Sequence, residues 1–267
     1  MTQTQRKVTL LAHTQLASDF YHDLLDSTEI GFEIGQGNVK SGQAVGLTSI
    51  RTCYSANKPS EILALEGERY FKRKATDGGA GTEADRLIRM IQSSGHSSTL
   101  EHLSFTFAIE GVSRALLAQL TRHRIGFSFS VQSQRYVKFG SDDRIGGFDY
   151  IMPDTIKDEI VEKEINGNTY ILSPKESFEQ MMRDIQSYYD FLRGLGVPAE
   201  DARAVLPNAA SVNLVMTANL TALIGLYSKR RKGSGSQAEI AELVEDIRKA
   251  VVAVEPWADA LFEEAWH

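Results

Sequence analysis

The chain has 267 residues, of which 42% are hydrophobic and 24% charged, and its formal net charge is −6. This is the composition of an ordinary globular protein with a sizeable core, and the single cysteine, Cys53, excludes an intrachain disulfide and a multi-thiolate metal site. Because neither a secretion signal nor a membrane-spanning run is found, a reducing, cytoplasmic setting is expected, with Cys53 as a small buried residue.

The first part of the chain alternates short elements with glycine-rich segments. The pattern predicts a strand at 7–12, turns or loop at 31–46, a helix at 44–54 and an exposed charged segment at 66–77. A helix is also predicted at 82–94, because Thr82 can cap its N-terminus and Asp85 occupies the capping-box position.

The second part of the chain carries stronger periodic patterns. Ser113 is a suitable N-cap for a helix that runs out near Arg124. The remaining patterns predict strands at 103–109, 130–139 and 210–218, an acidic peripheral segment at 153–168, and helices at 174–195, between 197 and 207, at 219–230 and at 237–254. We find no repeats, and the elements predict one α+β domain over 1–267, with a mostly antiparallel sheet flanked by helices.

Two long segments of this acidic chain contain no acidic residue. Residues 111–141 carry Arg114, Arg122, Arg124, Arg135 and Lys138, and residues 202–238 carry Arg203, Lys229, Arg230, Arg231 and Lys232. Apolar strands and helices hold few charges of either sign, and solvated basic faces are common. The arginines that remain nevertheless favour two walls of one anion-binding pocket, since a guanidinium suits phosphate and carboxylate.

The densest part of the first segment is Arg122-His123-Arg124. Cations at a helix C-terminus gain about 0.3–1 kcal/mol each, but three adjacent cations also repel one another. On the predicted strand, Ser133 and Arg135 would share one face and could clamp a nucleotide phosphate.

Together, Arg122-His123-Arg124 and Ser133-Gln134-Arg135-Tyr136 resemble the signature of flavin-dependent thymidylate synthases. Further matches follow in the order of that family: the block 95–102 before Phe105-Thr106-Phe107, then Gln119, 196–198, 202–203, 206–207, 217–219, 230–231 and 237–240. The resemblance therefore covers most of the chain.

The resemblance implies roles for residues of this chain. FAD contacts are implied for Ser55, His96, Ser98, Glu101, Arg122, His123, Arg124, Ile125, Val131, Asn219, Thr221 and Gly225. Contacts with dUMP are implied for Gln119, Arg122, Val131, Gln132, Ser133, Gln134, Arg135, Arg203 and Arg230. The catalytic arginine that stabilises the ionised uracil is Arg230 or Arg231; Arg230 is favoured, because an insertion fits more easily into the Gly233–Ser236 linker than into a helix.

The implied reaction is the reductive methylation of dUMP to dTMP, with 5,10-methylenetetrahydrofolate as carbon donor and NADPH as reductant through bound FAD. The implied assembly is a homotetramer with active sites at subunit interfaces, and neither nucleic acid nor a membrane is an expected partner. Departures from the family pattern at Ser130, Val131, Thr221 and Gly225 affect details of the FAD and nucleotide contacts.

Two other interpretations stay open. Arginines with Phe127, Phe129 and Tyr136 could bind single-stranded nucleic acid, although the overall acidity argues against it, and a relative without turnover could bind nucleotide only. A metal site is not expected, because the spacing of His96, Glu101 and His102 fits no standard helical site.

Overall fold

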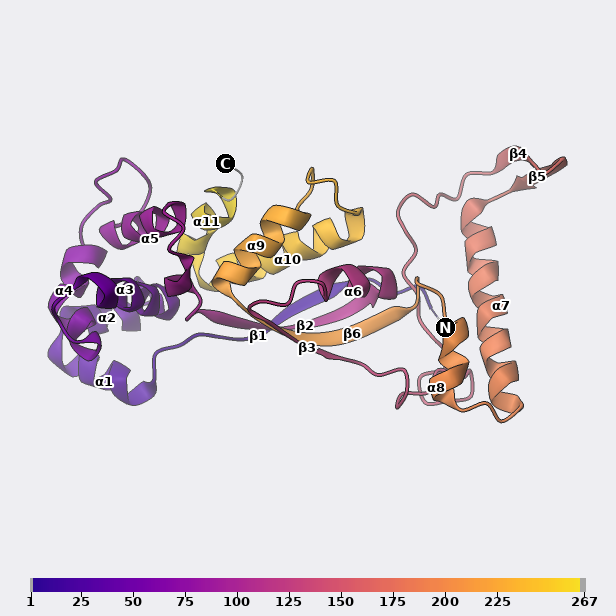
Figure 1. Ribbon diagram of the computed structural model, residues 1–267, viewed down its shortest axis with the longest axis horizontal. Helices are drawn as coiled ribbons and strands as arrows, with labels where there is room; N and C mark the ends of the chain where they lie inside the picture. The colour runs from indigo at the N-terminus through magenta and orange to yellow at the C-terminus, as the bar shows by residue number, and fades with distance from the viewer. Residues whose placement is uncertain (1, 265–267) are drawn as a thin grey trace. The chain divides into compact units, whose positions relative to one another are not determined.

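The larger of the two sheets in the described residues has four strands. The computed structural model describes residues 2–264. The strands are β1 (Lys7–His13), β2 (Ser104–Ser113), β3 (Phe127–Val131) and β6 (Ser211–Asn219), in the order β1-β2-β6-β3. The sheet is antiparallel and flanked by helices (Figure 1), so the predicted α+β class is confirmed.

The described residues group into two compact units. The first unit comprises residues up to Lys7, Ile109–Arg122 and Phe129–Val215; the second comprises Val8–Ala108, His123–Ser128 and the chain from Met216 onward. Both units are therefore assembled from segments that lie far apart in the sequence. The expectation of one domain over 1–267 stays a prediction.

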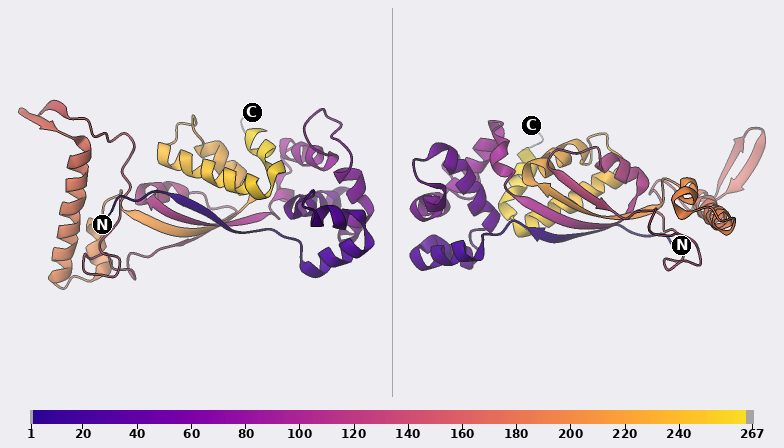
Figure 2. Two further views of the ribbon diagram at one scale, coloured as in Figure 1. Left: turned by 180° about the vertical axis from the view of Figure 1, so that it is seen from behind. Right: turned by 60° about the horizontal axis from the view of Figure 1, so that its bottom comes forward.

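The second unit is mostly helical. Its N-terminal helices are α1 (Ser18–Ser27), α2 (Glu29–Gly35), α3 (Ser41–Tyr54), η1 (Pro59–Glu61), α4 (Ile62–Phe71), α5 (Glu83–Ser93) and η2 (Ser97–Leu100). Its C-terminal helices are α9 (Leu220–Arg230), α10 (Ala238–Val254), η4 (Pro256–Ala258) and α11 (Asp259–Glu264), and α9 and α10 lie side by side (Figures 1 and 2). No helix in the described part of the chain combines the length and apolarity needed to cross a membrane.

The prediction of loop at 31–46 is wrong, since α2 and α3 occupy most of that segment. The glycines that suggested a loop sit where helices pack closely. A Cβ on Gly31 would clash with the backbone of Leu25, and one on Gly42 would lie 2.5 Å from a carboxylate oxygen of Glu255. Close approach of neighbouring elements, rather than a turn, therefore accounts for these two glycines.

The prediction of an exposed charged segment at 66–77 is also wrong over its first half. Residues up to Phe71 belong to α4, in which Glu66, Gly67, Tyr70 and Phe71 are buried. The Arg51 guanidinium lies 5.4 Å from the centre of the Tyr70 ring and donates to Glu66, so the charge at Glu66 is paired inside the fold.

The first unit contains α6 (Arg114–Leu120), the hairpin β4 (Val161–Ile165) and β5 (Asn168–Leu172), α7 (Pro174–Gly194), α8 (Ala199–Ala202) and η3 (Arg203–Val205). Its core is built from Phe139, Phe148, Tyr150, Met182, Tyr189, Ala202 and Ala210. The buried Gln186 of α7 accepts from Phe148 N and donates to Phe139 O, both at 2.9 Å, so α7 is fixed to the segment that precedes the hairpin.

Two boundaries next to the Arg122 motif differ from the prediction. Helix α6 ends at Leu120 rather than near Arg124, and β3 ends at Val131, so the predicted strand 130–139 is wrong. Beyond β3 the chain turns, because Ser133 Oγ accepts from Arg135 N at 3.2 Å and Ser133 O accepts from Val137 N at 2.9 Å. A serine that bonds the backbone two residues on favours a turn over a strand.

The capping box predicted for α5 is present, and it gives a stability test. Thr82 accepts from the backbone at Asp85, whose carboxylate accepts from Thr82 N at 2.6 Å. We expect Thr82→Ala to lower the free energy of unfolding by about 1 kcal/mol, measured by urea denaturation. Thr169→Ala on the exposed hairpin is the matched control, and an equal loss in both variants would contradict the role of the cap.

Candidate functional site

The Arg122-His123-Arg124 motif follows α6 directly and leads into β3. Arg122 and Arg124 are exposed, whereas His123 is half-buried. No carboxylate in residues 2–264 forms an ion pair with Arg122 or Arg124. Two adjacent positive charges without acidic partners favour an anionic ligand.

Both ends of helix α9 contact the short segment from His123 to Gly126. Asn219, the N-cap of α9, donates its backbone N–H to Gly126 O at 3.1 Å. Arg230, in the last turn, donates from Nε to His123 Nε2 at 3.2 Å. Gly126 has φ +77°, and a Cβ there would lie 2.7 Å from Ala222 Cβ, so this contact requires glycine.

The first turn of α9 also contacts η2, which carries other residues implied for FAD. Thr221 Oγ1 donates to Ser97 O at 2.8 Å, next to Ser98. His96 precedes η2, and its Nδ1 lies 2.9 Å from the hydroxyl of Tyr54, the last residue of α3. Of the residues implied for FAD, Arg122 and Val131 belong to the first unit, and the second unit contains the others: Ser55, His96, Ser98, Glu101, His123, Arg124, Ile125, Asn219, Thr221 and Gly225. Ile125 is 91% exposed.

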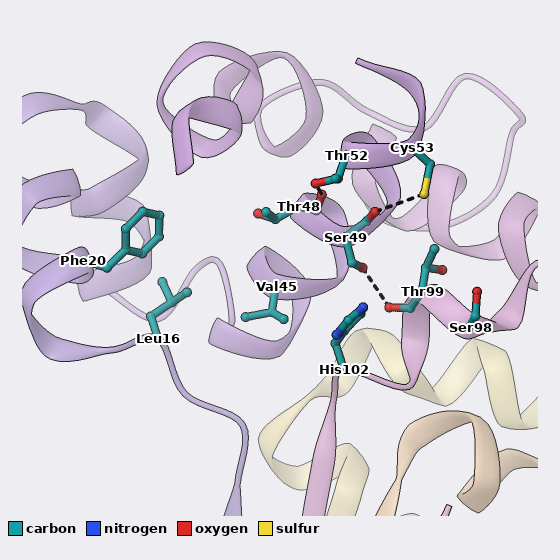
Figure 3. A pocket seen from close by; sticks show the side chains of 10 residues that line it. All are labelled: Leu16, Phe20, Val45, Thr48, Ser49, Thr52, Cys53, Ser98, Thr99 and His102. Carbon is teal, nitrogen blue, oxygen red and sulfur yellow. Dashed lines mark hydrogen bonds between the residues drawn. The ribbon is translucent and has the colours of Figure 1, made fainter. Parts of the chain in front are cut away.

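A cavity of about 500 Å³ opens beside η2 in the second unit. Figure 3 shows Ser98, Thr99 and His102 on one side, Ser49 and Cys53 of α3 on another, and Leu16 and Phe20 opposite. The volume is in the range of ligand sites, and the lining is mainly apolar with a few hydroxyl groups. The expectation that Cys53 is buried is wrong, because its thiol is exposed at this cavity.

Ser55 ends α3, and a buried carboxylate fixes it in place. Its Oγ donates to Glu66, which also accepts from Arg51 Nε at 2.6 Å and Asn57 Nδ2 at 2.9 Å. Burial alone would raise the pKa of Glu66, but the hydrogen bonds from Ser55, Arg51 and Asn57 outweigh it and lower the pKa. Glu66 therefore stays ionised and organises the chain around Ser55.

The first unit contains a chain of contacts among charged side chains. Arg135 Nε donates to Glu200 Oε2 at 2.9 Å, and Arg203 Nε donates to the backbone oxygen of Glu200 at 2.9 Å. Burial, and then repulsion from the Arg203 guanidinium, lower the pKa of Arg114. Within residues 2–264 the Arg114 side chain has no hydrogen-bond or ion-pair partner. Of these three guanidinium groups only that of Arg135 forms an ion pair within the described chain, and its partner is the exposed Glu200.

The first unit also contains Gln119, Val131, Gln132 and Gln134, which are implied for dUMP. Gln134 is only 7% exposed, and its Nε2 has no hydrogen-bond partner among the described residues. Gln132 Oε1 accepts from Asn213 Nδ2 at 3.1 Å, and Gln119 Nε2 donates to Ala115 O at 3.4 Å. Val131 is half-buried at the end of β3. A buried amide donor without an acceptor costs about 1–3 kcal/mol, so Gln134 favours a ligand oxygen at this place.

Sequence reasoning missed three residues of these clusters. Arg114 stood in the first acid-free segment without an assigned role, Glu200 lies two residues before the second segment, and Glu66 fell within the segment interpreted as exposed. The arginine left over in an acid-free segment was the available signal for Arg114. Neither carboxylate had a sequence signal, since Glu66 and Glu200 pair with residues distant in sequence, Arg51 and Arg135.

Comparison with known proteins identifies the family. The sequence profile of the family described as thymidylate synthase complementing protein matches residues 38–257. The chain is similar to the flavin-dependent thymidylate synthase of Geobacter sulfurreducens, at 40% identity over 177 residues, which are 66% of this chain and 68% of the relative. It is also similar to that of Nitratidesulfovibrio vulgaris, at 47% identity over 192 residues, which are 68% of this chain and 66% of the relative.

The chain belongs to the flavin-dependent thymidylate synthase family. The predicted family and the predicted enzyme class are thereby confirmed. The fold agrees: thymidylate synthase X of Helicobacter pylori, solved with FAD and dUMP, superposes with a TM-score of 0.57 at 20% identity and covers 98% of this chain and 99% of that one. Flavin-dependent enzymes carry out their redox chemistry on a bound flavin.

The side chains of the second unit fit FAD. Arg124 is a guanidinium without an acidic partner in the described chain and can contact a pyrophosphate, and the cavity beside Ser98 offers apolar walls of the size that a ring system needs. In residues 2–264 there is no group of three or more His, Cys, Asp or Glu side chains that could hold a metal ion. The expected absence of a metal stays a prediction.

The carboxylate of Glu66 gives a pH-dependent test. Because its folded pKa is lowered, its stabilising contribution is fully present above the unfolded pKa of about 4.3 and is lost as the pH falls through the folded value. We expect Glu66→Gln to cost about 1–3 kcal/mol of unfolding free energy at pH 7, and the difference from the unsubstituted chain to shrink below about pH 4.

The matched control is Glu68→Gln on the same helix, whose exposed side chain lies 4.0 Å from Lys72. It should change stability by less than about 0.5 kcal/mol at either pH. A loss for Glu66→Gln that is independent of pH would contradict the role of the charge. Chemical denaturation at a series of pH values measures both variants.

Proposed function

We propose that this enzyme converts dUMP to dTMP, with 5,10-methylenetetrahydrofolate as carbon donor and NADPH as the source of two electrons. Tetrahydrofolate and NADP⁺ leave with the product. The observation that carries the proposal is the unbalanced positive charge in the first unit. Among the described residues the Glu200 carboxylate pairs with Arg135 alone, and Arg203 bonds only the backbone oxygen of Glu200. Arg114 is repelled by Arg203. Membership of the family supplies the reaction class.

The nucleotide phosphate binds at this arginine cluster. The ion pair between Arg135 and Glu200 is exposed, so it contributes only about 0.2–1 kcal/mol and can give way to a dianionic phosphate. Ser133 lies in the same turn and adds a hydroxyl donor, while the buried Nε2 of Gln134 gains an acceptor. Gln119 lies in the last turn of α6 and Arg122 lies two residues beyond the end of this helix, and both belong to the residues implied for dUMP.

Arg230 acts on the uracil ring. A fixed guanidinium favours negative charge on the ring oxygens, and this raises the nucleophilicity of C5, the carbon that receives the one-carbon unit. Arg230 is preferred to Arg231 because it contacts His123 of the motif. FAD, when bound, carries electrons from NADPH to the transferred carbon, and residues around Ser55, His96, Ser98, Asn219 and the motif hold it in place.

The assembly is a homotetramer with active sites at subunit interfaces. Several large apolar side chains of α7 and of its C-cap are exposed, and such patches support association: Met181, Tyr188 and Phe191 in α7, and Leu195 at the C-cap. Light scattering of the purified protein tests the assembly. A cytoplasmic location is part of the proposal and rests on the single cysteine.

The proposal is tested by spectroscopy and turnover. The purified protein is expected to be yellow, or to become so on reconstitution with FAD, and to oxidise NADPH in a dUMP-dependent way while forming dTMP from methylenetetrahydrofolate. A protein that binds dUMP but never forms dTMP would be a nucleotide-binding relative without turnover. A protein that binds single-stranded oligonucleotide in a salt-dependent way, and not dUMP, would show the alternative nucleic-acid function.

The arginine cluster gives a separable test. We expect Arg114→Met to raise the Kd for dUMP about tenfold to a hundredfold, because a hydrogen bond to a charged group is worth about 1.5–3 kcal/mol. The affinity for deoxyuridine, which has no phosphate, should change little. Arg183→Met, in the same unit and hydrogen-bonded to Gln180, is the control. Equal losses for dUMP and deoxyuridine would place Arg114 away from the phosphate. Calorimetry measures both affinities for the two variants and for the unsubstituted chain.

A further inference from the structure

We infer that Arg230 fixes the ring tautomer of His123, so that His123 meets the flavin cofactor as a hydrogen-bond donor from Nδ1 rather than as an acceptor. The role toward the flavin rests on the proposed function. The observation that carries the inference is the hydrogen bond of 3.2 Å between Arg230 Nε and His123 Nε2.

The chemistry of the two side chains decides where the proton lies. A guanidinium has five N–H donors and no acceptor, and it stays charged in proteins. Nε2 of His123 must therefore supply the lone pair in this contact. In a neutral imidazole only one nitrogen carries hydrogen, so the proton is on Nδ1. A doubly protonated ring is disfavoured, because it would place a second positive charge against Arg230.

The same contact leaves Arg230 available for the nucleotide. The bond to His123 uses the Nε hydrogen, and the four hydrogens on Nη1 and Nη2 remain as the planar fork that recognises carbonyl and anionic oxygens. Arg230 can thus bridge His123 and the uracil ring at once. His123 in return holds the guanidinium plane, so each side chain positions the other.

Neighbouring contacts hold the side chains of His123 and Arg230 in place. Three residues after His123, the carbonyl of Gly126 accepts a hydrogen bond from Asn219 N. The His123 ring lies 6.1 Å from the Phe127 ring in a tilted arrangement. Arg230 is half-buried at the end of α9, and α9 begins at Asn219. The two contacts therefore anchor both ends of one short segment on one helix, which limits rotation of the imidazole.

Nuclear magnetic resonance tests the tautomer directly. The full chain is labelled with ¹⁵N-histidine, and two-bond ¹H–¹⁵N correlations at about pH 8, where imidazole is neutral, show which ring nitrogen carries hydrogen. His123→Gln identifies the His123 signals. We expect Nδ1–H in the FAD-free protein and in the FAD complex, with a downfield shift of that proton when FAD binds.

Substitutions on α9 test whether the hydrogen bond from Arg230 sets the tautomer of His123. Arg230→Met and Arg230→Lys should both lose the Nδ1–H preference, and Arg230→Lys should do so although it keeps the charge. Lys229→Gln, which removes a positive charge from the preceding position of α9, should leave the His123 tautomer unchanged. If both Arg230 variants keep the Nδ1–H form, or Lys229→Gln loses it, the assignment to Arg230 is wrong.

The unsubstituted chain alone can overturn the inference, so it does not depend on the variants folding. Nε2–H in the FAD complex would refute the donor role of His123 and leave the proposed reaction intact. A protein that binds no FAD under reconstitution would refute the flavin role together with the proposed function. Retained Nδ1–H in the FAD complex, lost only in the Arg230 variants, supports the inference.

Discussion

The candidate site depends on how α9 holds the residues that follow Arg122. Asn219 at the start of this helix bonds the backbone of Gly126, and Arg230 at its end bonds the ring of His123. An eleven-residue helix is about 16 Å long, so two anchors on it define both the position and the direction of a short segment. The glycine is required, because its φ of +77° and the closeness of Ala222 leave no room for a side chain. These contacts fix the backbone of Gly126 and the ring of His123 on α9, whereas the side chains of Arg122 and Arg124 stay exposed.

Electrostatics favour a ligand at the arginine cluster of the first unit, which consists of Arg114, Arg135 and Arg203. In the first unit Arg114 is partly buried beside Arg203, with no carboxylate of its own, and Glu200 serves Arg135 with its side chain and Arg203 with its backbone. Like charges held together at partial burial raise the free energy of the unliganded protein. A bound phosphate reverses the sign of that term, so part of the strain becomes binding energy. In the second unit the charge of Glu66 is balanced, because its buried carboxylate accepts hydrogen bonds from Ser55, Arg51 and Asn57 and needs no ligand.

Much of the fold was predictable because its signals are local. The capping box of Thr82 and Asp85, the N-caps Ser113 and Asn219, and the amphipathic α7 all lie within a few residues of the pattern that reveals them. The failures have tertiary causes. Gly31 and Gly42 resembled loop glycines, but they serve close packing against Leu25 and Glu255. The predicted strand beyond Val131 was lost to the turn that Ser133 forms with its own backbone. The candidate site residues could be predicted because motifs follow one another along the sequence in the order of the family. The ion pair between Arg135 and Glu200 and the repulsion between Arg114 and Arg203 could not, because each joins segments far apart in the sequence and no periodic pattern reveals it.

Thr221 shows how a departure from a family pattern can be absorbed. The resemblance implied an FAD contact at this position, where relatives often carry arginine. Its hydroxyl instead donates to Ser97 O at 2.8 Å and ties the first turn of α9 to η2, the element that carries Ser98. A short side chain committed to the protein backbone cannot also reach a cofactor phosphate as a guanidinium would. Within the second unit, Arg124 has no acidic partner among the described residues and can supply a positive charge. Thr221 therefore ties α9 to η2, and we expect the anionic part of a cofactor to take its positive charge from the motif rather than from this position.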